Sequence, residues 1–178
     1  MEKDIKIILY TKKEIDETVK KLSLSIIEDY KEKNPVIISI MDGSLFFCRD
    51  LLQHLVFPLT INSLNVSSYI NNSHTKNLCL GPYFLTHVVD KHIILVDDMI
   101  DTGNTINFVI NFLKKFNPKS LEVCTLFRVK KSKATYRPFV KYVGFDIDDG
   151  SLVGYGMDFK EKYRNLPYVG YLKPHLLK

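Results

Sequence analysis

Three carboxylates and a short run of small polar residues follow an apolar stretch near the middle of the chain. Residues 93–96 are apolar, and Asp97, Asp98 and Asp101 come next, before the sequence Thr-Gly-Asn-Thr at 102–105. The apolar run predicts a strand buried on both faces, and the ligands of parallel sheets bind beyond the carboxyl ends of such strands. The pattern therefore predicts a small-molecule site where this strand ends.

The residues that follow the acids are suited to binding phosphate. A helical pattern covers 104–116, so the backbone N–H groups of the loop would lie at a helix N-terminus, where the macrodipole favours an anion. Asp97 and Asp98 could accept hydrogen bonds from the vicinal hydroxyls of a ribose. The simpler alternative is a strand end followed by a helix capped by Thr102 or Asn104. Three like charges this close repel unless a cation or a hydroxyl-rich ligand compensates them, which favours the binding site.

Motifs elsewhere in the chain indicate which kind of site this is. The loop has neither a Walker lysine nor a G-x-G-x-x-G pattern, so it differs from the common nucleotide-binding loops. The segment 93–105 resembles the phosphoribosyl-diphosphate (PRPP) signature of type I phosphoribosyltransferases, in the hypoxanthine-guanine branch. The resemblance extends over roughly residues 12 to 174. Further segments agree with it in the right order: Met41-Asp42-Gly43-Ser44, Ser67-Ser68-Tyr69, Val143-Gly144-Phe145, Val-Gly-Tyr-Gly-Met-Asp-Phe at 153–159 and Tyr-Arg-Asn-Leu-Pro-Tyr at 163–168.

The resemblance implies an enzyme of purine salvage. Such an enzyme transfers the 5-phosphoribosyl group from PRPP to hypoxanthine or guanine, gives IMP or GMP and pyrophosphate, and requires Mg²⁺. Carried over by motif, Asp97 and Asp98 hold the ribose hydroxyls and help to bind the metal, and Asp101 accepts a proton at purine N7. The 5′-phosphate is assigned to Asp101, Thr102, Gly103, Asn104 and Thr105.

The resemblance assigns the purine and the diphosphate to other segments. A lysine that donates to the 6-oxygen accepts hypoxanthine and guanine and rejects adenine; the spacing favours Lys130 and leaves Lys131 open. Asp158 is also implied as a direct magnesium ligand. The purine-binding residues implied are Lys130, Ser151, Leu152 and Asp158, and the pyrophosphate-binding residues are Asp42, Gly43, Ser68, Tyr69 and Arg164.

Two positions depart from the family pattern. Asp42 stands where a lysine is common, so its carboxylate either points away from the diphosphate or contacts magnesium. The same loop often offers a backbone N–H through a strained peptide, and the Met41–Asp42 bond is the candidate. Ser151 stands where an aromatic side chain stacks on the purine, so either purine affinity is weaker or another ring, such as that of Tyr155 or Phe159, compensates.

Composition narrows the class of protein. The 178 residues are 46% hydrophobic and contain no run long enough to span a membrane. The charged N-terminus is unlike a secretory signal, and the three spaced cysteines are expected to be reduced core thiols, which together predict a cytoplasmic protein. The net charge of +5 is expected to reflect solvated helix faces rather than a nucleic-acid surface. We therefore expect no nucleic-acid or membrane partner, and a homodimer or homotetramer.

Two other functions compete with purine salvage. A regulatory protein of the same fold could sense nucleotides and bind nucleic acid, although Asp101, Asp158 and Arg164 all persist here. A phosphoribosyltransferase for another base, such as xanthine, is a closer alternative, because Asp42 and Ser151 are both expected near the substrates.

The order of apolar patterns predicts an α/β fold. Helices are expected at 11–30, 45–56 and 104–116, and strands at 36–41, 61–66, 93–96, 121–127 and 140–145. This alternation predicts one domain over 1–178, with a mostly parallel central sheet flanked by helices, and the resemblance implies the type I phosphoribosyltransferase fold with a small hood formed by the terminal segments. Residues 70–84 have no evident core face and are expected to form a lid-like loop that begins near Ser67.

Overall fold

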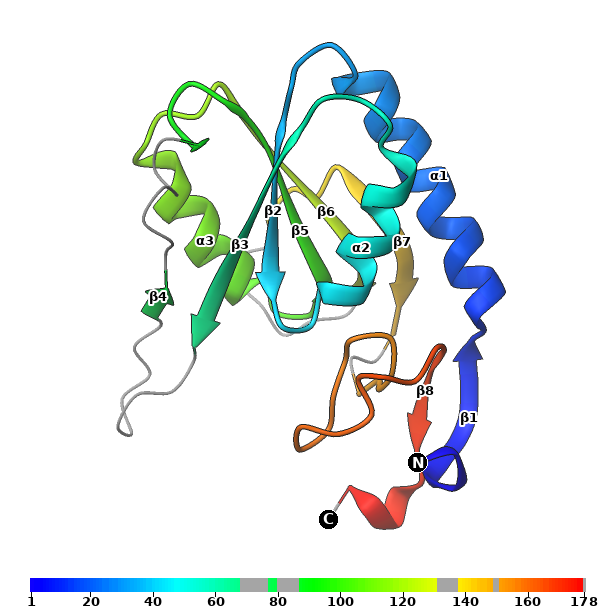
Figure 1. The fold of residues 1–178 in the computed structure, drawn as a ribbon. Coiled ribbons are helices and arrows are strands. Elements are labelled where there is room, and N and C mark those ends of the chain that lie inside the picture. Colours follow the sequence, from blue (N-terminus) through cyan, green and yellow to red (C-terminus); the bar gives the residue numbers. More distant parts are fainter. Residues whose placement is uncertain (68–76, 80–86, 131–137, 149–150, 178) are drawn as a thin grey trace.

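A six-stranded sheet forms the centre of the protein, with strand order β4-β3-β2-β5-β6-β7 (Figure 1). The computed structural model describes residues 1–67, 77–79, 87–130, 138–148 and 151–177. The strands are β2 (Val36–Met41), β3 (Thr60–Ser67), β4 (Asn77–Cys79), β5 (His92–Ile100), β6 (Ser120–Val129) and β7 (Tyr142–Ile147). All neighbouring pairs are parallel except β3 and β4. The expected mostly parallel sheet is therefore confirmed, and the carboxyl ends of β2, β5, β6 and β7 share one edge.

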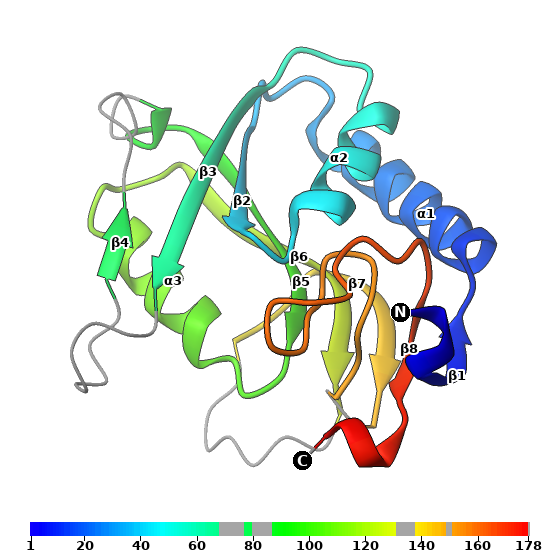
Figure 2. The same ribbon diagram turned by 60° about the horizontal axis from the view of Figure 1, so that its bottom comes forward.

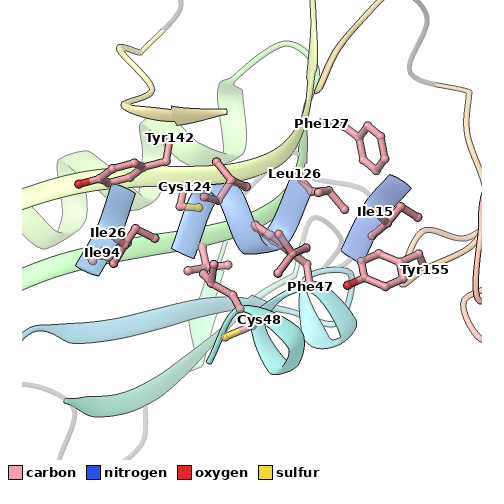
Figure 3. Packing of buried hydrophobic residues seen from close by; sticks show 14 of the residues in the cluster. Ile15, Ile26, Phe47, Cys48, Ile94, Cys124, Leu126, Phe127, Tyr142 and Tyr155 are labelled. Carbon is pink, nitrogen blue, oxygen red and sulfur yellow. The ribbon is translucent and has the colours of Figure 1, made fainter. Parts of the chain in front are cut away.

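Helices cover both faces of this sheet. The helices α1 (Lys12–Tyr30) and α2 (Leu45–His54) pack on one face, and α3 (Asn104–Lys114) packs on the other (Figure 1). The predicted capping box starts α1: the Glu14 N–H donates to Thr11 Oγ1 at 3.3 Å, and the Thr11 N–H donates to Glu14 Oε2 at 2.8 Å. Figure 3 shows the core under α1 and α2, where Ile15, Phe47 and Ile94 are fully buried.

The terminal segments form the expected hood beside the carboxyl edge of the sheet. The strand β1 (Ile5–Tyr10) pairs antiparallel with β8 (Val169–Leu172), and short 3₁₀ turns, η1 (Glu2–Asp4) and η3 (Pro174–Leu176), flank them (Figure 2). At the end of β1 the ring of Tyr10 lies 4.1 Å from that of Phe145 and 5.3 Å from that of Phe127. These aromatic contacts join the hood to the ends of β6 and β7.

The element boundaries differ in places from the expected ones. The helix expected at 45–56 ends at His54, because the next residue, Leu55, is buried in a non-helical conformation well before Pro58. The helix expected to reach 116 ends at Lys114, and β7 begins at Tyr142 rather than at 140.

The expected loop at 70–84 contains a strand. Residues 77–79 pair with the end of β3, with Asn65 opposite Cys79. Three residues are too few for an apolar period to be visible, so the backbone pairing with an edge strand could not be read from the sequence. The rest of the proposed lid, including Ser68 and Tyr69, lies outside the described residues.

The thiols of Cys48 and Cys124 are free and buried in the core, as expected, and burial raises the pKa of both. Within the described ranges, no helix is both long and apolar enough to cross a membrane.

Candidate active site

Two adjacent aspartates lie near the carboxyl end of β5, where the apolar run of this strand ends. Asp97 is only 7% exposed, and Asp98 is half-buried beside it. Burial raises the pKa of both carboxyl groups, and repulsion by Asp98 raises the pKa of Asp97 further. The pair therefore holds a proton more readily than ordinary aspartates, and a bound hydroxyl or cation would relieve the repulsion.

The loop after β5 surrounds a small pocket of about 130 Å³. Gly103, with φ +77°, is the N-cap of α3 in place of Thr102 or Asn104, although the Asn104 N–H donates to Thr102 Oγ1 at 3.4 Å. A side chain at Gly103 would place its Cβ 2.9 Å from Pro138 Cδ, which explains why glycine is needed here. The pocket is lined by Asp97, Met99, Ile100, Asp101, Thr102, Gly103, Asn104, Thr105 and Ile106. All the residues that the resemblance assigned to the 5′-phosphate thus lie around one cavity.

A second pocket of about 250 Å³ lies between the end of β5 and the hood. It brings Asp98 together with residues of the 151–164 loop, which are more than 50 positions away in the sequence. Sequence reasoning named Leu152 and Phe159 but missed Met99, Leu172 and Leu177, because no local motif assigns the apolar residues of β5, β8 and the C-terminal turn to a shared pocket. The lining residues are Asp98, Met99, Ser151, Leu152, Val153, Met157, Asp158, Phe159, Arg164, Leu172 and Leu177.

Asp158 and Arg164 are paired with each other on the wall of this second pocket. Arg164 Nη2 lies 2.7 Å from Asp158 Oδ1 and 3.5 Å from Glu161 Oε2, and Arg164 Nη1 donates to the Gly156 carbonyl at 2.7 Å. The Glu161 N–H donates to Asp158 Oδ2 at 3.0 Å. The arginine is thus held by a carboxylate and a carbonyl, with part of its guanidinium facing the pocket.

The 41–44 loop lies against Asp98 on one side and against the 151–164 loop on the other. Its Met41–Asp42 peptide bond, the candidate in the sequence, is cis, and the Asp42 side chain is exposed. A Cβ on Gly43 would lie 2.7 Å from Asp98 Cγ, and a Cβ on Gly156 would lie 3.1 Å from the Gly43 carbonyl carbon. The backbone of Gly43 is therefore packed between Asp98 and the 151–164 loop.

Of the aromatic and basic residues considered for purine binding, Phe159 lines a pocket, whereas Tyr155 and Lys130 do not. Phe159 lines the second pocket, whereas Tyr155 is buried in the core and its hydroxyl donates to Asp50 at 2.6 Å. Tyr155 is therefore not the ring that replaces the aromatic at Ser151. The exposed side chain of Lys130 is absent from the lining of both pockets, and its backbone N–H donates to the Ile147 carbonyl at 2.7 Å. Lys131 lies outside the described residues.

The oxygen ligands present here suit magnesium. Among the described residues no cluster of three or more acidic, histidine or cysteine side chains could hold a metal by itself. Mg²⁺ is usually bound by one or two carboxylates together with substrate phosphates, so such a cluster is not required. Asp98 and Asp158 line the same pocket and offer carboxylate oxygens there.

Comparison with known proteins assigns the family. The phosphoribosyl transferase domain family matches residues 8–160. The chain belongs to this family. Hypoxanthine-guanine-xanthine phosphoribosyltransferase of Tritrichomonas foetus is 38% identical to this phosphoribosyltransferase, over 96% of the chain and 93% of the relative. Hypoxanthine-guanine phosphoribosyltransferase of Bacillus subtilis is 33% identical, over 98% of the chain and 97% of the relative.

Solved structures give the same result. A hypoxanthine phosphoribosyltransferase from Staphylococcus aureus superposes with a TM-score of 0.88 and 32% identity, over 100% of this chain and 97% of the other. The family, its hypoxanthine-guanine branch and the type I fold expected from the motifs are thereby confirmed. The chain is an enzyme of the phosphoribosyltransferase class rather than only a protein with its fold.

Proposed function

We propose that this enzyme transfers the 5-phosphoribosyl group of PRPP to hypoxanthine or guanine, releases pyrophosphate and gives IMP or GMP. One observation carries the proposal. The acid pair at Asp97 and Asp98 separates a pocket of phosphate-binding character from a pocket that holds Asp158 and Arg164. A ribose placed over the acids would direct its 5′-phosphate to one side, and its anomeric carbon would face the other.

The binding of PRPP follows from the positions of these residues. Residues 102–105 line the first pocket at the N-terminus of α3, where the helix macrodipole and the backbone N–H groups of the first turn favour the 5′-phosphate. Asp97 and Asp98 would accept hydrogen bonds from the ribose hydroxyls, which would compensate for their burial and for the repulsion by Asp98 that further raises the pKa of Asp97. Arg164 would exchange the carboxylate of Asp158 for the diphosphate, which it can bind through two parallel hydrogen bonds.

Asp158, Asp97 and Asp98 would hold Mg²⁺ together with the diphosphate, and the bound cation neutralises the charge of the leaving group. When Arg164 binds the diphosphate, the Asp158–Arg164 ion pair would break, and the Asp158 carboxylate would be free to bind Mg²⁺. In the 41–44 loop, Gly43, which packs against Asp98 and Gly156, would offer its backbone to the diphosphate, and the exposed Asp42 would turn away from it.

The transfer step requires the purine to attack as pyrophosphate leaves. Asp101 is exposed on the wall of the first pocket, and its carboxylate would reach across the ribose toward the second pocket to accept the proton of purine N7 while N9 bonds to the anomeric carbon. Phe159, Leu152 and Ser151 would form the walls of the purine site in the second pocket. A lysine at 130 or 131 would donate to the 6-oxygen, which excludes the 6-amino group of adenine.

The experiment that tests this function compares four bases. Hypoxanthine, guanine, xanthine and adenine are incubated separately with PRPP and Mg²⁺, and nucleoside monophosphate is measured. We expect product from hypoxanthine and guanine, and little from adenine. Product from xanthine alone would establish the alternative base, whose presence in the name of the Tritrichomonas foetus relative keeps it in view. No product from any base would favour the regulatory, nucleic-acid-binding alternative.

The remaining expectations concern the whole protein. We propose that the chain acts as one phosphoribosyltransferase domain in the cytoplasm, as a homodimer or homotetramer, without a nucleic-acid or membrane partner. The family match over 8–160 and the nearly full-length similarity to the relatives support the single domain.

A further inference from the structure

A buried tyrosine connects the 151–164 loop to α2. Tyr155 is 3% exposed, and its hydroxyl donates to Asp50 Oδ2 at 2.6 Å. Its ring lies 6.2 Å from that of Phe46, and its own backbone is left-handed, with φ +50°. A left-handed conformation is costly for a bulky side chain and persists only where the surroundings hold it. The hydroxyl bond, the ring packing and a hydrogen bond from the Tyr155 N–H to the Leu166 carbonyl at 2.8 Å hold this residue, and the first two of these connect it to α2.

Asp50 is itself fixed on α2. Its other carboxylate oxygen, Oδ1, accepts from Arg49 Nε at 2.7 Å and lies 2.6 Å from Arg49 Nη2. The side chain of Asp50 is only 13% exposed. Tyr155 is thus bonded to a carboxylate whose orientation is set from the other side by a planar guanidinium.

The residue after Tyr155 makes a second contact with the same helix unit. Gly156, with φ +101°, packs against the Gly43 carbonyl, and Gly43 lies just before α2 begins at Leu45. The 151–164 loop therefore contacts the α2 unit at two points, the body of α2 through Asp50 and the loop that starts α2 through Gly43. Asp50 lies on α2 and Gly43 lies two residues before its first residue, so the rigid helix connects the two points.

These contacts reach the groups that are expected to bind the diphosphate. The Gly156 N–H donates to the Arg164 carbonyl at 2.9 Å, and Arg164 Nη1 donates to the Gly156 carbonyl at 2.7 Å. The position of the guanidinium thus depends on Gly156, which neighbours the Tyr155 anchor. Gly43, on the opposite side, depends on the start of α2.

We propose that Tyr155 and Asp50 form a positioning pair that keeps the 151–164 loop in register with the 41–44 loop, so that Arg164 and Gly43 meet one diphosphate. The inference rests on the proposed function, because it assumes that these two loops share the diphosphate. Neither Tyr155 nor Asp50 touches the substrate. They act through Gly156 and α2, and losing the pair would misplace one half of the diphosphate site.

The test removes only the tyrosine hydroxyl. Tyr155→Phe keeps the ring beside Phe46 and leaves Asp50 paired with Arg49. Binding is measured by calorimetry with two probes, pyrophosphate in the presence of Mg²⁺ and ribose 5-phosphate. We expect the affinity for pyrophosphate to fall about tenfold, the effect of losing about one hydrogen bond between the guanidinium and the diphosphate. The affinity for ribose 5-phosphate should stay unchanged, because the 102–105 loop makes its contacts elsewhere.

The chain offers a closely matched control. Tyr142 is 4% exposed, and its hydroxyl donates to Asp29 Oδ2 at 2.6 Å, while Asp29 stays paired with Lys141 at 2.8 Å. This bond joins β7 to α1 and includes no residue of the two loops. Tyr142→Phe removes an equivalent bond, so it should lower stability similarly and leave the binding of both probes at the wild-type level.

A double-mutant cycle tests whether Tyr155 and Asp50 affect pyrophosphate binding through the hydrogen bond that they share. Asp50→Ala alone should weaken pyrophosphate binding about as much as Tyr155→Phe, and the double variant should lose no more than either single variant. In turnover, Tyr155→Phe should raise the KM for PRPP. Tyr142→Phe, which removes an equivalent bond outside the two loops, should leave that KM at the wild-type value.

Each outcome has one meaning. Pyrophosphate binding by Tyr155→Phe at the wild-type or the Tyr142→Phe level would overturn the proposal, as would an equal loss for ribose 5-phosphate or additive effects in the cycle. If the wild-type enzyme binds neither probe, the proposed function itself fails, and that result is visible before any variant is compared.

Discussion

At the scale of single residues, burying adjacent acids at the end of β5 lowers the stability of the folded chain and provides carboxylates for binding the substrate. Asp97 is buried beside Asp98, and burial together with their repulsion raises its pKa. The sequence predicted this crowding, since three acids lie within five positions. It could not predict which acid is buried, because that depends on the neighbouring strand and on Gly43, which lies in contact with Asp98.

The raised pKa predicts a pH-dependent effect of Asp97→Asn. The folded chain holds the Asp97 proton more tightly than the unfolded chain, whose aspartates titrate near 3.8. The wild-type free energy of unfolding therefore falls as the pH rises from that value through the raised pKa. The asparagine cannot ionise, so the variant should be the more stable at about pH 7, with the difference vanishing near pH 4. Urea unfolding at both pH values measures this, and a gain of equal size at both would contradict it.

A second residue-scale prediction concerns Asp101. Asp101→Asn keeps the size of the side chain and removes the charge that favours a proton at purine N7. Turnover should fall on the order of 10²-fold or more, the range of general acid–base groups, while the affinity for PRPP changes much less. Steady-state kinetics with hypoxanthine would show this. Turnover close to that of the wild type would leave Asp101 without a role in proton transfer.

At the scale of elements, the helices and the parallel strands of the sheet followed from the sequence, whereas β1, β4, β8 and the loop geometry did not. The apolar runs of β2 and β5 and the capping box of α1 were readable, because their periods are local. The strand β4 was not, since its three residues acquire their structure from pairing with β3. The placement of Tyr155 and Phe159 in opposite directions also depends on left-handed residues in the 151–164 loop, which no local period signals.

The 151–164 loop gives a prediction for purine binding. Phe159 is the aromatic residue that lines the second pocket, so Phe159→Ala should raise the purine KM about tenfold, as expected from a loss of ~1–3 kcal/mol of base stacking. The KM for PRPP should change little. Phe116→Ala, which removes a ring that packs against Phe112 after α3, serves as the control. An unchanged purine KM in the Phe159 variant would show that the purine stacks elsewhere.

At the scale of the whole molecule, the hood and the sheet must stay together for the second pocket to exist. The pocket takes Asp98 and Met99 from β5 and its remaining walls from the hood side. Tyr10, Phe127 and Phe145 join the two parts, with the rings of Phe127 and Phe145 stacked at 5.3 Å. The sequence indicated a hood only through the family resemblance, because β1 and β8 lie at opposite ends of the chain and pair without a local signal.

This junction predicts a large effect of Phe127→Ala. Phe127 is fully buried, so truncation should lower the free energy of unfolding by about 3–5 kcal/mol through lost burial and the cavity left behind. Denaturant unfolding measures the change. Phe139→Ala, at a ring that is 79% exposed, is the control and should cost much less. Similar losses in the two variants would show that the aromatic junction does not hold the hood.

The central claim is that the two pockets around Asp97 and Asp98 bind one PRPP and pass its ribosyl group to a purine. The most direct measurement follows IMP and pyrophosphate together, in a reaction of the wild-type enzyme with PRPP, hypoxanthine and Mg²⁺. We predict one pyrophosphate for each IMP, and neither product when hypoxanthine or the metal is left out. Pyrophosphate without IMP, or no product at all, would contradict the claim.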